Sequence, residues 1–90
     1  MNLTYEAALQ KYVRLCAKSE RELRRGHSPL LPYLHAMSHA CEFSQPFPAM
    51  SELRGIDEQD RQDIILLLHY LVTHVFVPDE FRRQFDRIGA

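Results

Sequence analysis

The longest apolar segment of the chain reads IILLLHYLVTHVFV and spans residues 64–77. From Ile64 onward its apolar side chains fall on nearly every side of a helix, which is typical of a helix buried on most sides. Two histidines and a threonine interrupt the segment within fourteen positions, whereas a membrane-spanning helix needs about 20 apolar residues. The segment therefore predicts a core helix, with Leu68 enclosed at its centre.

Start and stop signals bound this helix on both sides. Asp57 is a capping residue before it and Pro78 ends it, so we expect a helix from residue 57 to about residue 76. Pro-Asp-Glu then begins a new helix, in which Phe81, Phe85 and Ile88 recur at i, i+4 and i+7. This pattern predicts a short helix that packs inward through three side chains.

Two further helices are expected in the first half of the chain. Residues 2–25 carry apolar side chains at spacings of three, four and seven, and Gly26 follows as a terminator. Ser28 and Pro29 are typical of an N-cap and a first helical position, so a second helix should run to about Glu42. Prolines then predict a loop over residues 43–48, followed by a short helical turn over residues 49–53.

These elements place the chain in the all-α class. No segment alternates as a strand does, and no period of about 20–50 residues repeats. We predict a single small helical domain over residues 1–90, built as a four- to five-helix antiparallel bundle or as an orthogonal helical array.

Composition and charge exclude several classes of protein. Apolar residues make up 46% and charged residues 26% of the 90 residues, as in an average soluble globular domain. The formal net charge of -1 argues against a nucleic-acid-binding or membrane-surface protein. Two cysteines are too few for a disulfide framework, and the first residues show no secretory signal, so we expect reduced thiols and a cytoplasmic location.

Charge is nevertheless segregated along the chain. Residues 1–27 hold six basic and three acidic residues, for +3, whereas residues 28–63 hold two and six, for -4. Five basic residues of the first helix fall within about 80° of one another, opposite its apolar face. This basic strip is either a solvated face or an exposed surface that docks on an acidic partner protein. It consists of Lys11, Arg14, Lys18, Arg21 and Arg25.

A second candidate site lies on the second helix. His35, His39 and Glu42 recur at i, i+4 and i+7, which places three metal-ligand types on one face. They would suit a metal-responsive sensor or repressor, but the other histidines diverge on their own helix and supply no fourth ligand. We therefore predict that the chain needs no metal or other cofactor, and that these histidines flank the core or an interface.

Residues suited to catalysis do not form a recognisable set. Cys16 and Cys41 fall on apolar helix faces, and no glycine-rich segment could hold a phosphate. Asp60 and Asp63 share a helix face, but we expect them in its solvated first turn, where nothing raises either pKa. The chain is therefore predicted not to be an enzyme.

Large apolar residues exceed what one face of each helix requires. Phe43 and Phe47 lie in the proline-rich loop and are predicted to bind a partner, because aromatic residues are enriched in interface cores. Self-association could use this loop or the helix that contains Leu67, Leu71 and Val75. We predict a small protein-binding regulator (an adaptor, inhibitor or anti-activator) that docks stoichiometrically on a partner and could form a homodimer; the metal-responsive sensor is the alternative.

Overall fold

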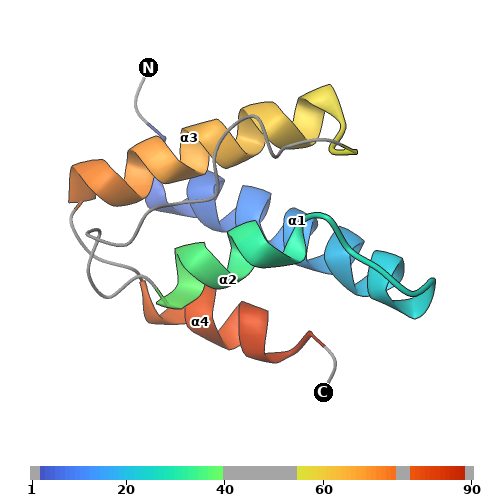
Figure 1. The fold of residues 1–90 in the computed structure, drawn as a ribbon. Helices are drawn as coiled ribbons and strands as arrows, with labels where there is room; N and C mark the ends of the chain where they lie inside the picture. Colours follow the sequence, from blue (N-terminus) through green and yellow to red (C-terminus); the bar gives the residue numbers. More distant parts are fainter. Residues whose placement is uncertain (1–2, 40–54, 75–77, 89–90) are drawn as a thin grey trace.

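The computed structural model describes residues 3–39, 55–74 and 78–88. These residues form four α-helices, which are α1 (Tyr5–Arg24), α2 (Leu31–His39), α3 (Glu58–His74) and α4 (Asp79–Asp86). The prediction of a small all-α fold is confirmed. In Figure 1, α1 lies at the centre, with α3 on one side of it and α4 on the other, and α1 packs on all three of the other helices.

Local sequence signals set the ends of α1. The Thr4 hydroxyl accepts a hydrogen bond from the Ala7 amide at 3.1 Å, so the helix begins at Tyr5 rather than at residue 2. At the other end Arg25 is the C-cap, and Gly26 adopts a φ of 115°, a left-handed conformation that favours glycine. The predicted helix and its glycine terminator are therefore confirmed.

The segment before α2 differs in detail from the prediction. The helix begins at Leu31, three residues after Ser28. The Ser28 hydroxyl is buried and forms hydrogen bonds with the hydroxyl of Ser19 at 2.6 Å and with the carboxylate of Glu22 at 2.9 Å. Ser28 thus ties the turn back onto α1. Beyond His39 the expected continuation of this helix lies outside the described residues.

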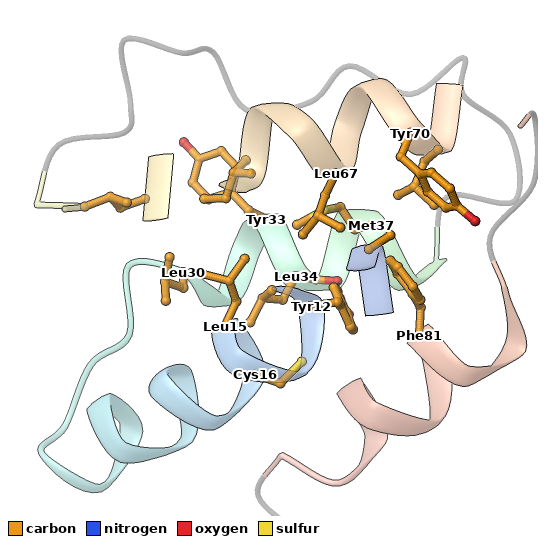
Figure 2. Close-up of a cluster of buried hydrophobic side chains, with 14 residues drawn as sticks. Tyr12, Leu15, Cys16, Leu30, Tyr33, Leu34, Met37, Leu67, Tyr70 and Phe81 are labelled. Carbon is orange, nitrogen blue, oxygen red and sulfur yellow. Dashed lines mark hydrogen bonds between the residues drawn. The ribbon is translucent and has the colours of Figure 1, made fainter. Parts of the chain in front are cut away.

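All four described helices contribute buried side chains to the core, and Leu67 and Tyr70 come from α3 (Figure 2). The rings of Tyr12 and Phe81 stack with centroids 4.4 Å apart and planes 16° apart. The Tyr12 hydroxyl, which would be costly to bury without a partner, donates to the Leu34 carbonyl oxygen at 2.9 Å. Phe85 and Ile88 are partly buried against the same core, so the three predicted residues pack inward, although α4 ends at Asp86 and Ile88 lies in the turn that follows it.

The core helix α3 buries one face only, and the prediction that it is buried on most sides is wrong. Ile64, Leu67 and Leu71 are fully buried, whereas Ile65 is 44% and Val72 56% exposed. The physical reason is position: α3 packs on α1 and α2 but not on the described part of α4 (Figure 1). Its outer side therefore faces away from the other described helices.

Two predictions about individual leucines change with this packing. Leu68 is only partly buried, so it is not enclosed as expected. Leu67 and Leu71 are core residues, and self-association cannot use their side chains without opening the domain. Val75, the third residue of that expected interface, lies outside the described residues.

Candidate functional site

The interface between α1 and α3 contains an array of opposite charges. Lysine and arginine recur on one face of α1 at spacings of three and four, and aspartates recur every third residue at the start of α3. The two helices lie side by side and run in opposite directions (Figure 1), so the two rows come together in reverse order. The array consists of Lys11, Arg14 and Lys18 of α1 with Asp57, which immediately precedes α3, and with Asp60 and Asp63 of α3.

Every cation of the array contacts at least one carboxylate. The Nζ of Lys11 lies 3.1 Å from Asp63 Oδ1. The Nη2 of Arg14 bridges two aspartates, at 2.8 Å from Asp60 Oδ1 and 2.6 Å from Asp63 Oδ2. Lys18 also bridges two, because its Nζ pairs with Asp60 and lies 2.8 Å from Asp57 Oδ2.

Burial and charge act in opposite directions on the two central carboxyl groups. Asp60 and Asp63 are each only 2% exposed, and burial alone would raise the pKa of both. Hydrogen bonds from Lys18 and Arg14 to Asp60, and from Arg14 and Lys11 to Asp63, outweigh burial, so the pKa of each lies below its usual value. Both carboxylates are therefore charged at neutral pH and bound by cations.

This arrangement corrects two expectations from the sequence. The aspartates are not in a solvated turn, because α1 covers them. The basic strip is not free along its length: three of its five residues hold α3 in place. Arg21 and Arg25, in the last turn and cap of α1, are exposed, and neither forms an ion pair with any residue that the structure describes.

A groove of about 460 Å³ lies beside the charge array. Lys11, Arg14 and Asp63 form its charged part, and Gln59 donates to Asp63 Oδ1 at 3.3 Å. Gln10, an exposed residue of α1, also lines it, as does Ala7. Neither glutamine was singled out from the sequence. The sequence feature that could have identified them is their proximity to charged residues of the array: Gln10 directly precedes Lys11, and Gln59 directly precedes Asp60.

The outer face of α3 carries exposed apolar side chains. Ile65, Leu66 and Val72 each have at least 40% of their surface exposed. Ile65 and Val72 are seven residues apart and so lie on the same side of the helix, with exposed His69 between them. Single exposed apolar residues are common, but a group on one helix face is a feature of binding surfaces.

The remaining predicted site residues are not brought together in the described part of the chain. His35 is exposed on α2, and its ring meets that of Phe85 edge-on, with centroids 5.4 Å apart. His39 is the last residue of α2, and the position of its side chain is outside the described structure, as are Glu42, Phe43 and Phe47. Within residues 3–39, 55–74 and 78–88 no three histidine, cysteine or acidic residues form a metal-binding group.

The buried cysteine is not activated for chemistry. Cys16 is a free thiol on the core side of α1. Burial raises the pKa of the Cys16 thiol to about 12, and a hydrogen bond with Tyr12 only partly opposes this effect. A nucleophilic cysteine requires the thiolate, so this residue behaves as a small apolar side chain.

Comparisons with known proteins add no relative. No protein-family model, curated protein or solved structure matches the chain. Among the described helices, none combines the length and the apolar character that crossing a membrane requires.

Proposed function

We propose that this protein is a small protein-binding regulator that docks stoichiometrically on a partner and acts without catalysis. The observation that carries the proposal is the exposed apolar face of α3, formed by Ile65, Leu66 and Val72. Protein interfaces have apolar centres with polar rims, and this face has that composition: Gln62 and His69 are exposed on the same helix.

The chemistry of the partner follows from the charges that remain accessible. Arg21 and Arg25 are exposed and have no ion pair in the described residues, and the side chain of Arg14 is 44% exposed. Exposed cations of this kind complement an acidic surface and increase association rates with it. The partner is therefore a protein with an acidic docking surface rather than a nucleic acid, because acidic residues balance the cations over the chain as a whole.

The metal-responsive alternative gains no support from the described structure. His35 contacts an aromatic ring of α4, and the other two members of its predicted set lack described side chains. A cytoplasmic location is part of the proposal, since the buried free thiol of Cys16 suits a reducing compartment.

Capture from a lysate of the native host, followed by binding assays with the purified captured protein, tests the proposal. Ile65→Ser and Val72→Ser remove exposed apolar groups from α3, whereas Val13→Ser removes one from α1 and is the matched control. We expect the two α3 variants to lose affinity for the partner and the control to retain it, while all three variants remain folded. Equal affinity of all the variants would contradict the assignment of the α3 face.

Sedimentation equilibrium distinguishes a different protein from a second copy of this chain. A heterologous partner leaves the isolated protein monomeric and gives a one-to-one complex on mixing. A dimer of the isolated chain that Val72→Ser dissociates would instead assign the same face to self-association.

A further inference from the structure

The groove between α1 and α3 contains hydrogen-bond donors that have no acceptor among the described residues. Lys11 forms one bond, to Asp63, although an ammonium group has three donors. Arg14 uses only Nη2, for Asp60 and Asp63, so the N–H groups on its Nε and Nη1 have no partner among the described residues. The exposed amide of Gln10 adds further donors on the α1 side.

Among the described residues that line this groove, only Asp63 carries a carboxylate, and both of its oxygens already accept hydrogen bonds. Asp63 accepts from Lys11 at 3.1 Å, from Arg14 at 2.6 Å and from Gln59 at 3.3 Å. Because it is almost fully buried, it offers no accessible acceptor to a ligand. The described lining therefore has two cations and one anion, and Asp60 pairs with Arg14 from beside it, so the charges balance while the donors exceed the accessible acceptors.

We infer that this groove receives an aspartate or glutamate side chain of the partner protein. A carboxylate is an acceptor group of single negative charge, and it matches the excess of hydrogen-bond donors in the lining. A phosphate group carries about -1.5 to -2 charges, and the neighbouring carboxylates of Asp60 and Asp63 would oppose that second charge. The inference rests on the proposed function and adds to it one specific subsite.

The groove and part of the apolar face of α3 lie on the same side of that helix. Leu66, which is exposed, follows Gln59 by seven residues and so lies two helical turns along the same side of the helix. A partner that inserts an acidic side chain between α1 and α3 would bring its neighbouring residues over Leu66. The two features can therefore belong to a single interface.

Nuclear magnetic resonance titration of the isotope-labelled protein tests the subsite directly. The probe is the blocked peptide acetyl-Gly-Glu-Gly-amide, and its counterpart with Gln in place of Glu is the control peptide. We expect the side-chain amide signals of Gln10 and Gln59 to shift saturably with the Glu peptide and not with the Gln peptide. Absence of a shift, or equal shifts with both peptides, would overturn the inference.

Variants of single glutamines show whether the response comes from the groove. Gln10→Glu places a negative charge in the lining and should weaken binding about threefold, as expected for one exposed charge interaction. Gln84→Glu makes the same change on α4, which does not line the groove, and should leave binding unchanged. Equal effects of the two variants, or equal shifts on adding sodium chloride at the same concentration, would show a general ionic effect and overturn the subsite.

The outcome of this test is independent of the outcome for the proposed function. The signals of Gln10 and Gln59 report on the groove without the natural partner and without the apolar face. If the Gln10 and Gln59 signals do not shift with the Glu peptide but Val72→Ser loses affinity for the partner, the acidic subsite is refuted and the docking face of α3 is supported.

Discussion

Helix α1 joins its neighbours α3 and α4 by two different kinds of interaction. Toward α4 it presents the ring of Tyr12, which is fully buried and stacked on Phe81. Toward the first turns of α3 it presents lysine and arginine side chains, which hold buried aspartates by ion pairs. The same helix thus makes one contact that depends on apolar burial and one that depends on charge.

The difference determines which conditions act on each contact. Salt and acid weaken ion pairs, because salt screens charges and acid neutralises carboxylates. Neither condition removes the stabilisation from a buried aromatic stack. The start of α3 should therefore be the part of the domain whose stability responds most to solution conditions.

Removal of the aromatic contact should have the largest effect. Phe81→Ala deletes a fully buried ring that stacks on Tyr12, and truncation of a core phenylalanine typically costs about 3–5 kcal/mol. Urea unfolding of the variant and of the wild type measures the loss. The loss should be similar at low and at high salt; a strong salt dependence would contradict the separation of the two contacts.

Removal of a buried carboxylate charge should have the next largest effect. Asp60→Asn leaves the side chain in place but neutralises the partner of Arg14 and Lys18, for an expected loss of about 1–3 kcal/mol. Glu58→Gln is the control, since the Glu58 side chain is 70% exposed and its ion pair with Arg61 spans 3.5 Å. Equal stabilities of the two variants by urea unfolding would show that the array contributes nothing.

The pH dependence of stability should sharpen this result. The pKa values of Asp60 and Asp63 are lower in the folded protein than in the unfolded chain. The unfolded state therefore takes up protons first as pH falls, so the stabilisation is complete above the ordinary aspartate pKa of about 3.9 and is lost below it. Between pH 6 and about pH 3, urea unfolding should show a steeper loss for the wild type than for Asp60→Asn; parallel curves would refute the assignment.

Much of the helical framework can be predicted from sequence because its signals are local. Thr4 and Gly26 set the ends of α1 through backbone geometry that depends only on neighbouring residues. The inward residues of α4, Phe81 among them, follow from helical spacing alone. Such features need no knowledge of which helix packs on which.

The features that the sequence did not predict depend on tertiary arrangement. The opposite charges of residues 1–27 and 28–63 were visible in the sequence, but their pairing required α1 and α3 to be adjacent and antiparallel. The outer face of α3 could not be distinguished from its core face, because both are apolar in this helix. Only the position of α3 at the edge of the described domain separates Leu67, which is buried, from Val72, which is exposed.

The smallest expected effects on stability come from the basic strip, and they should differ between residues that pair with the aspartates and residues that do not. Lys18→Gln removes a cation that bridges Asp57 and Asp60, and its loss should cost about 1 kcal/mol, because one of the two aspartates is buried. Arg21→Gln makes the same kind of change on an exposed residue of the same helix and should alter stability by less than about 0.5 kcal/mol. Thermal unfolding of the two variants, monitored by circular dichroism, compares them directly. In the partner-binding assay Arg21→Gln should instead lower the affinity more than Lys18→Gln does, because Arg21 is free to contact an acidic surface, whereas Lys18 is held by ion pairs to Asp57 and Asp60. Equal melting temperatures would show that the whole strip is a solvated face and that α3 does not depend on it.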